Sequence, residues 1–307
     1  MIENKEFREK IQNIVSGQVL FDEPMHLYTS MGVGGKADIL VSPGSIEELQ
    51  KTILYLVKCN VSFVPAGNCT NLIVRDGGYR GAVISLKRLE EMVLKKGEGG
   101  YVYLYAETGV SLSRLVELSI RESLSGIEFC AGIPGSVGGG MKMNAGAYGE
   151  ELKDVVNKIS FINGNGTIKE VGRDDLRFEY RNLILSEGDV IVSAVFGLQA
   201  GSKEKIQEKV SDIIDRRKRK HPLAYRSAGS VFKNPENVPA GKIIDEVGLK
   251  GFQIGDAKIS ETHGNFIVNL GKAKAKDITL LIEMIRKRVL EEKGITLDPE
   301  IKIIGEE

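Results

Sequence analysis

The chain contains 307 residues, and its 42 lysines and arginines are balanced by 42 aspartates and glutamates. A chain of this length suggests about two domains and can bury a core without disulfide or metal cross-links, while the near-zero net charge argues against a dedicated nucleic-acid-binding protein. Glycine is the unusual component, at 36 residues or about 12% of the chain against about 7% in average proteins.

The part of the chain before residue 201 alternates short predicted strands and helices. Ser45-Ile46-Glu47-Glu48 has the pattern of a capping box, and apolar residues at helical spacing follow it up to Val57. A second helix is indicated from Leu112 to Ile120, and Asn163–Gly166 has the composition of a hairpin turn. The predicted strands are Ala37–Val41, Val61–Pro65, Ala82–Leu86, Tyr101–Ala106, Lys158–Ile162, Thr167–Val171 and Asp189–Leu198.

The sequence pattern changes after Gln199–Ser202, and we place a domain boundary at residue 201. The next helix has inward apolar residues from Ile206 to Ile214 and ends in the basic run Arg216–Lys220. We interpret that run as a solvated helix end, whose charge suits the helix C-terminus, in preference to a nucleic-acid site. The elements predicted after it are a strand at Asn265–Asn269, a helix capped by Asp277 and ended by Gly294, and a strand at Pro299–Ile304.

Cysteine and histidine are sparse, with three residues of each type. They form no C-x-x-C or H-x-x-x-H pair, so we expect neither a disulfide framework nor a metal site, and we expect a reducing, cytoplasmic setting. The N-terminal residues lack the apolar core of a signal peptide, and no apolar run approaches the about 18 residues that span a bilayer. We therefore expect a cytoplasmic protein without membrane or nucleic-acid partners.

Glycine is concentrated in three clusters before residue 150. The first is Gly32–Gly35, the second runs from Pro65 to Leu72 and continues in Arg75–Gly78, and the third spans Gly132–Gly149. Glycine-rich loops let backbone N–H groups face an oxyanion, so two of these loops are suited to hold one pyrophosphate, although tight turns alone also use glycine. No cluster fits the Rossmann or P-loop pattern, which indicates another way of binding a dinucleotide.

Five segments in chain order resemble the UDP-N-acetylenolpyruvoylglucosamine reductase family. They are GNCTNLIVRDGGYRG, GIEFCAGIPGSVGGGMKMNAGAYG, FEYRNL, SAGSVFKNP and DPEIKIIG, and the similarity extends from about Met31 to Gly305. The spacing of FEYRNL and SAGS resembles the shorter form of the family.

The resemblance implies an α+β fold class. An FAD-binding domain of the vanillyl-alcohol-oxidase (PCMH) type is expected over residues 1–201, as two α+β subdomains split near residue 86. An α/β substrate-binding domain is expected over residues 202–307, with its last strand carrying Glu300. The implied activity is a cytoplasmic flavoprotein oxidoreductase of peptidoglycan synthesis, and so of cell wall biogenesis, cell shape, cell cycle and cell division. It would use bound FAD and NADPH as co-substrate to reduce a UDP-sugar enolpyruvyl ether, and we expect it to be a monomer.

The resemblance also implies the site residues. Ser230 corresponds to the proton donor, Arg181 to the arginine that holds the substrate carboxylate, and Glu300 to the catalytic glutamate. Without the resemblance, the sequence favours a turn serine and a surface arginine at the first two positions, and Glu300 also fits an edge charge in solvent. The cofactor-binding residues are expected to be Gly67, Asn68, Cys69, Thr70, Asn71, Leu72, Ala131, Gly132, Ile133, Pro134, Gly135, Ser136, Gly138, Gly139, Asn144, Ala145 and Gly146. The substrate-binding residues are expected to be Tyr180, Lys233, Asn234, Lys258 and His263, with His263 equally suited to a structural role.

Two positions depart from the family pattern. Cys69-Thr70 stands where relatives commonly have Gly-Ser, so the Cys69 side chain must point away from the phosphates, and Gly139–Lys142 lacks the usual alanine and arginine. Two other functions stay open: a different FAD oxidoreductase acting on a hydroxy acid or aldonolactone, and a nucleotide-binding or scaffold protein without catalysis. Flavin colour separates the second from the enzymes, and NADPH oxidation that depends on the enolpyruvyl substrate separates the first.

Overall fold

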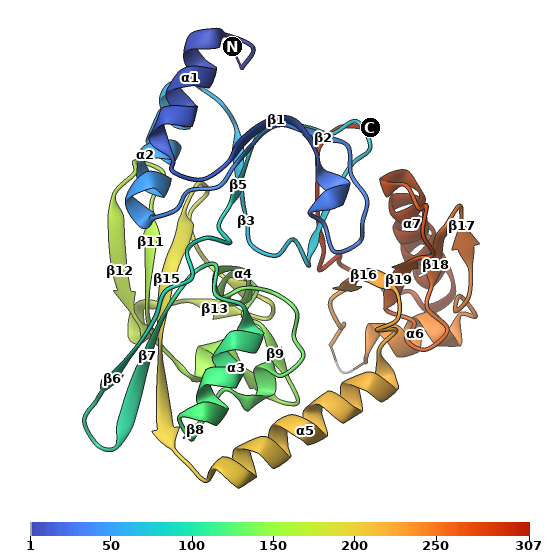
Figure 1. Cartoon of the computed structure of the whole chain (residues 1–307). Helices are drawn as coiled ribbons and strands as arrows, with labels where there is room; N and C mark the ends of the chain where they lie inside the picture. The colour runs from blue at the N-terminus through green and yellow to red at the C-terminus, as the bar shows by residue number, and fades with distance from the viewer. Residues whose placement is uncertain (1, 237) are drawn as a thin grey trace. The chain divides into compact units, whose positions relative to one another are not determined.

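The computed structural model of the chain describes residues 2–236 and 238–307. It divides into two compact units (Figure 1). Unit 1 comprises Met1–Phe21, Ile39–Asn68 and Gly81–Asp215, and unit 2 comprises Asp22–Asp38, Cys69–Arg80 and Arg216–Glu307. The expected assignment of residues 1–201 to the cofactor and 202–307 to the substrate is a functional division, and it stays a prediction.

Helices and strands are found where the sequence pattern predicts them, together with the helices α1, α4 and α6 and several strands that it does not predict. The helices of the described residues are α1 (Lys5–Ile14), α2 (Ile46–Lys58), α3 (Leu112–Arg121), α4 (Val137–Lys142), α5 (Lys203–Lys220), α6 (Ala240–Glu246) and α7 (Ala275–Lys293). The strands are β1 (Val19–Pro24), β2 (Lys36–Val41), β3 (Phe63–Ala66), β4 (Leu72–Val74), β5 (Tyr79–Ser85), β6 (Met92–Lys96), β7 (Tyr101–Glu107), β8 (Leu124–Ser125), β9 (Gly146–Ala147), β10 (Glu150–Glu151), β11 (Val156–Ile162), β12 (Ile168–Gly172), β13 (Phe178–Glu179), β14 (Asn182–Leu183), β15 (Val190–Ala200), β16 (Arg226–Ser230), β17 (Gln253–Ile254), β18 (Ala257–Ile259), β19 (Phe266–Asn269) and β20 (Lys302–Ile304). No helix in the described part of the chain is long and apolar enough to cross a membrane.

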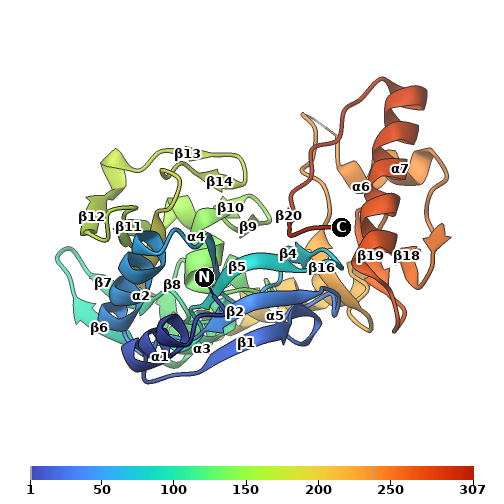
Figure 2. The ribbon, with the colours of Figure 1, turned by 90° about the horizontal axis from the view of Figure 1, so that it is seen from above.

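Unit 1 contains an antiparallel sheet in the order β12-β11-β15-β7-β6, with β8 also paired to β15. The predicted hairpin is confirmed, because Ile162 pairs with Ile168 and the Asn163 carboxamide oxygen accepts from two backbone N–H groups inside the turn. One apolar core lies between this sheet and α3, and another involves α1 and α2, which lie side by side in Figure 2.

The start of α2 differs in one detail from the predicted capping box. The Ser45 hydroxyl accepts from the Glu48 N–H, as predicted. The Glu48 carboxylate, however, accepts from the Gly44 N–H at 2.7 Å, one residue earlier than a capping box places it. The reciprocal half of the predicted box is therefore wrong, because the carboxylate fixes the turn that leads into the helix.

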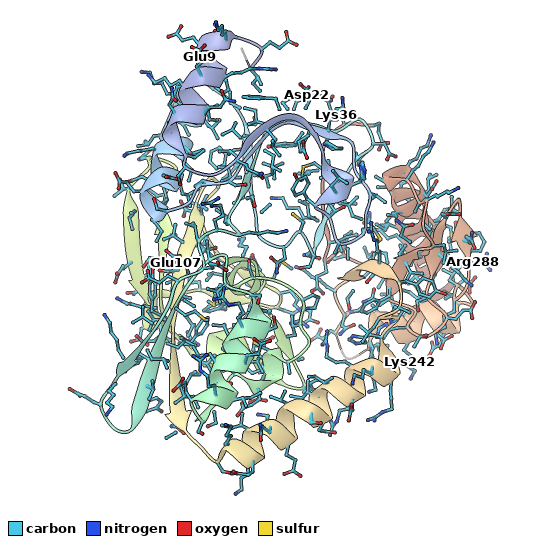
Figure 3. All side chains as sticks on the ribbon, viewed as in Figure 1. Glu9, Asp22, Lys36, Glu107, Lys242 and Arg288 are labelled. Carbon is cyan, nitrogen blue, oxygen red and sulfur yellow. The ribbon has the colours of Figure 1, made fainter. Side chains whose placement is uncertain are left out.

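Unit 2 is built on a four-stranded sheet in the order β16-β19-β18-β17 and on a parallel pair, β20-β4. Helix α7 packs on β17 and β18, and its apolar side chains share a core with those of α6. The charged side chains of these helices, such as Lys242 on α6 and Arg288 on α7, are exposed (Figure 3).

The starts of two predicted C-terminal elements need correction. Helix α7 begins at Ala275, so Asp277 lies in its first turn, where its carboxylate accepts from the Lys274 N–H at 2.9 Å. The last strand begins at Lys302, so Glu300 precedes the strand instead of lying within it. Gly294 ends α7 as predicted, with a left-handed φ of 66°.

Candidate active site

The second and third glycine clusters meet in unit 1. A Cβ placed on Gly67 would lie 2.2 Å from the Ser136 hydroxyl oxygen, so only glycine lets the two loops approach this closely. Gly67 follows β3, and Ser136 is the N-cap of the short helix α4. The structure thus brings parts of the second and third glycine-rich clusters together, and the expectation that two such loops hold one pyrophosphate stays a prediction.

Within the third cluster, two glycines of α4 allow close packing against neighbouring side chains, and a third is exposed. A Cβ on Gly138 would lie 1.9 Å from the Thr108 hydroxyl, and one on Gly140 would contact Leu112 and Leu152 at 3.1–3.4 Å. Gly139, between them, is exposed. The carboxamide of Asn144 is fully buried and joins Glu151 and the Lys153 N–H, so that side chain fixes the loop that follows.

The residues at this meeting point fit the diphosphate of a dinucleotide. Gly132 and Gly135 have φ values of 71° and 146°, so the loop presents backbone groups without Cβ atoms in conformations that other residues avoid. The hydroxyl group of Ser136 adds a neutral donor. Cys69 is buried with a φ of 51°, which explains physically why a glycine suits this position, and its side chain is 8% exposed.

Replacing Gly67 with Ala is expected to weaken FAD binding at least tenfold, because the new methyl group forces the loops apart and overpacking costs about 1–3 kcal/mol. Flavin absorbance per protein after gel filtration measures the effect. Gly172→Ala is a matched control, since nothing lies within 4 Å of the added Cβ. Unchanged flavin content in Gly67→Ala would contradict the assignment.

Three other glycines of the first two clusters, Gly35, Gly77 and Gly78, pack main chain against main chain in unit 2. A Cβ on Gly35 would lie 2.2 Å from the Asp76 carbonyl oxygen, and one on Gly77 would lie 2.6 Å from that of Glu307. The Asp76 carboxylate accepts from the Ala275 and Lys276 N–H groups and so caps α7. These glycines support the segment that carries the end of the chain, a contact that the sequence pattern does not predict.

Arg181 lies in the two-residue turn of the β13-β14 hairpin in unit 1. Its φ is 58°, an unfavourable conformation for a residue with a Cβ, and its guanidinium lies 5.3 Å from the ring of Tyr180, which is 47% exposed. Lys142, at the end of α4, donates to the Leu183 carbonyl at 2.7 Å and to the Asn182 side chain. The hairpin is thus attached to the third glycine cluster.

Ser230 and Glu300 lie on adjoining segments of unit 2. Ser230 ends β16, whose pairing with β19 is irregular between Ser227 and Ser230 and contains Gly229 at a φ of 77°. Such an irregularity redirects the side chain that follows it. The Glu300 N–H donates to the carbonyl of Val231, the residue after Ser230, at 2.8 Å. This main-chain hydrogen bond joins the segments of two predicted catalytic residues that are 70 positions apart in the chain.

Asn265 holds the same segment from the other side. Its buried carboxamide accepts from the Phe232 N–H at 2.9 Å and donates to the Phe232 carbonyl at 2.8 Å. Its own carbonyl accepts from the Val231 N–H. In the sequence Asn265 appears only as one polar residue among several, and no local pattern indicates this bidentate contact.

Two of the predicted substrate-binding residues of unit 2 have side chains that already contact other residues of the protein. The Asn234 carboxamide accepts from the Ala240 N–H at the start of α6, and Lys258 pairs with Glu261. The Lys233 N–H donates to the Asp298 carbonyl. The Lys233 contact holds the main chain three residues after Ser230, and the Lys233 side chain is half-buried.

A cavity of about 530 Å³ lies within unit 2, beside the predicted residue Lys258. Its walls include Tyr225 and the basic residues Lys218 and Arg219. Lys218 and Arg219 are exposed at the end of α5, as expected for a solvated helix end, and they border this open pocket.

His221 lines that cavity and forms an aromatic cluster with His263 and Phe266, with ring centroids 4.9–5.6 Å apart. Burial lowers the pKa of His221 to about 4, assisted by the positive charges of Arg217 and Lys220. Burial also lowers the pKa of His263. Both imidazoles are therefore neutral near pH 7.

We expect acid to destabilise unit 2 through His221. The unfolded imidazole, with a pKa near 6.5, takes up a proton before the folded one does, so its contribution to stability is complete above about pH 6.5 and is lost as the pH falls towards 4. The loss is about 1–2 kcal/mol, since the half-exposed ring is partly solvated. Urea unfolding of the parent and of His221→Phe between pH 7 and pH 4 measures it, and parallel pH profiles of the two proteins would refute it.

Comparisons with known proteins agree with this arrangement. Residues 37–172 match the model of an FAD binding domain, and residues 221–304 match that of the UDP-N-acetylenolpyruvoylglucosamine reductase C-terminal domain. A protein of Syntrophus aciditrophicus named UDP-N-acetylenolpyruvoylglucosamine reductase is 53% identical over 98% of this chain and 96% of its own length, and one of Caldanaerobacter subterraneus is 43% identical over 97% and 98%. The crystal structure of the reductase from Thermus caldophilus is 34% identical, with a TM-score of 0.79 over 93% of this chain and 98% of that one. These matches confirm the predicted α+β fold with an FAD-binding domain.

Proposed function

The chain belongs to the UDP-N-acetylenolpyruvoylglucosamine reductase family, a family of FAD-binding oxidoreductases, and on this premise we propose that it reduces UDP-N-acetylglucosamine enolpyruvate to UDP-N-acetylmuramate for peptidoglycan synthesis. NADPH is the proposed source of hydride. The observation that carries the proposal is the hydrogen bond of 2.8 Å from the Glu300 N–H to the Val231 carbonyl, because it joins the two segments that bear Ser230 and Glu300.

The loops that meet at Gly67 and Ser136 are the proposed FAD site. Their backbone amides and hydroxyls suit the pyrophosphate, and the remaining predicted cofactor residues continue the same two loops. Bound FAD, once reduced by hydride from NADPH, would supply the hydride that adds to the methylene carbon of the enolpyruvyl group. Asn144 contributes by fixing the loop after α4.

Ser230 is the proposed proton donor. Addition of hydride to the methylene carbon leaves negative charge on the neighbouring carbon and its carboxylate, as in an enolate. A serine hydroxyl is a weak acid, so it protonates only a strongly basic carbon, and an enolate meets that requirement. The proton moves from the Ser230 Oγ to the carbon beside the carboxylate, which completes the lactyl ether.

Arg181 and Glu300 are the proposed partners of Ser230 in this step. The planar guanidinium of Arg181 suits a two-point contact with the substrate carboxylate and stabilises the charge that develops there. Glu300 is half-buried and its main chain is joined to the Ser230 segment. Tyr180, next to Arg181, is proposed to orient the substrate.

The cavity beside Lys258 is the proposed site of the nucleotide part of the substrate. Lys218, Arg219 and Lys258 offer positive charge to a diphosphate, and Tyr225 offers a flat apolar surface to a base. Lys233 is proposed to add a further cation from the segment after Ser230, and His263 a neutral imidazole. A cytoplasmic location and a monomeric state stay predictions; Cys59, Cys69 and Cys130 are free thiols, as is usual in a reducing compartment.

Anaerobic half-reactions test the proposal directly. The purified protein is expected to be yellow, to lose its flavin absorbance on addition of NADPH, and to regain it when UDP-N-acetylglucosamine enolpyruvate is added. A colourless protein would support the non-catalytic alternative. Flavin that is reduced by NADPH but persists in the reduced form with this substrate would support an oxidoreductase of a different substrate.

A further inference from the structure

Both main-chain polar groups of Glu300 are held by partners from distant parts of the sequence. Its N–H donates to the Val231 carbonyl, and its carbonyl accepts from the carboxamide nitrogen of Asn71 at 3.0 Å. The carbonyl of Asn71 in turn accepts from the Lys302 N–H at 2.9 Å. Asn71 therefore contacts the chain on either side of residue 301.

This contact begins a longer parallel pairing. From Leu72 and Lys302 onward, β4 and β20 run side by side in register as far as Val74 and Ile304. Ile73 and Ile301 are buried in the core of unit 2. Glu300 itself precedes β20, so the regular pairing of β4 and β20 does not include it. The hydrogen bond from the Asn71 side chain extends the attachment of this segment to Glu300.

From this arrangement we propose that Asn71 is a positioning residue for Glu300. The Asn71 carboxamide holds the carbonyl of Glu300, and the Val231 carbonyl holds its N–H. These two hydrogen bonds fix the main chain of Glu300 and so the direction in which its side chain leaves the chain relative to Ser230. The inference rests on the proposed function for the role of Glu300. It assigns Asn71 a task other than cofactor binding, although Asn71 belongs to the predicted phosphate loop.

The test uses Asn71→Asp, which keeps the size of the side chain but replaces the N–H donor by a carboxylate oxygen facing the Glu300 carbonyl. Because Asn71 also belongs to the predicted cofactor loop, the parent and the variant are both saturated with added FAD, and the two half-reactions are compared within each protein. We expect flavin reduction by NADPH to be slowed far less than reoxidation. Reoxidation by the enolpyruvyl substrate is expected to slow by about 10- to 100-fold, since a displacement of catalytic groups by about 1 Å can cost about 100-fold. Asn163→Asp is the matched control, because that turn carboxamide accepts hydrogen bonds and a carboxylate accepts them equally.

A double-mutant cycle with Glu300→Gln separates positioning from a general structural role. If Asn71 acts through Glu300, the double variant should reoxidise no more than about twofold slower than Glu300→Gln alone. The proposal would be overturned if the rate losses of the two single variants multiplied in the double variant, or if both half-reactions of the FAD-saturated Asn71→Asp protein slowed equally.

Hydrogen exchange gives a readout that needs no substrate. The amides of residues 300–302 in the flavin-loaded Asn71→Asp protein are expected to exchange about tenfold faster than in the parent, with those of the Asn163–Gly166 turn unchanged. Unchanged exchange at residues 300–302 would overturn the positioning role. If the parent protein fails to reoxidise with the enolpyruvyl substrate, the proposed function fails, while this measurement still decides whether Asn71 holds Glu300.

Discussion

Ser230→Ala is expected to slow reoxidation of the NADPH-reduced protein by the enolpyruvyl substrate by about 10²- to 10⁴-fold, the range in which a positioned acid contributes to catalysis. Methyl in place of hydroxyl removes the proton donor and leaves β16 and its pairing with Phe266 intact. Stopped-flow recovery of flavin absorbance measures the rate. Reduction by NADPH should change less than twofold, because no proton from Ser230 enters that step.

Two further variants make the Ser230 result specific. Ser230→Cys keeps an acidic hydrogen at the same position and should recover part of the rate, since a thiol is a stronger acid than a hydroxyl. Ser227→Ala lies on the same strand, and it keeps the main-chain carbonyl that accepts from Ser30, so wild-type rates are expected. A wild-type rate of reoxidation in Ser230→Ala would remove Ser230 from the mechanism.

The elements with local signals could be predicted from the sequence. The hairpin turn at Asn163–Gly166 and the glycine stop of α7 at Gly294 depend on residues within a few positions of each other, and both are confirmed. Strand β6 was not predicted, because Met92–Lys96 lacks strict alternation and becomes a strand through its pairing with β7. Tertiary pairing supplies what the local pattern does not.

The supports of the candidate site were beyond the reach of local patterns. Asn71 and Glu300 are separated by 229 positions, and Asp76 caps α7 from about 200 positions away. Neither contact has a period or a spacing that a single sequence reveals. The resemblance placed Ser230 and Glu300 in one site, but it gave no account of what holds them, and that account comes from the hydrogen bonds of Val231, Asn265 and Asn71.

Replacement of Arg181 is the second change that we expect to have a large effect on activity. Arg181→Ala is expected to lower kcat/KM for the enolpyruvyl substrate by about 10²- to 10³-fold, the loss usual for one group that stabilises a developing oxyanion. Arg181→Lys should recover about tenfold of this, because an ammonium keeps the charge but lacks the planar fork that matches a carboxylate. Steady-state kinetics with saturating NADPH measure both.

The left-handed backbone of Arg181 allows chemistry and folding to be separated. At a φ of 58° a residue with a Cβ pays about 1–2 kcal/mol, and glycine does not. The greater freedom of glycine in the unfolded chain offsets part of this gain, so Arg181→Gly should be no less stable than Arg181→Ala in urea while being equally inactive. If activity followed stability across the Ala, Gly and Lys variants, the hairpin conformation would matter and the guanidinium would not. If the Ala and Gly variants are equally inactive and the Lys variant recovers part of the activity, the effect belongs to the positive charge beside the substrate carboxylate.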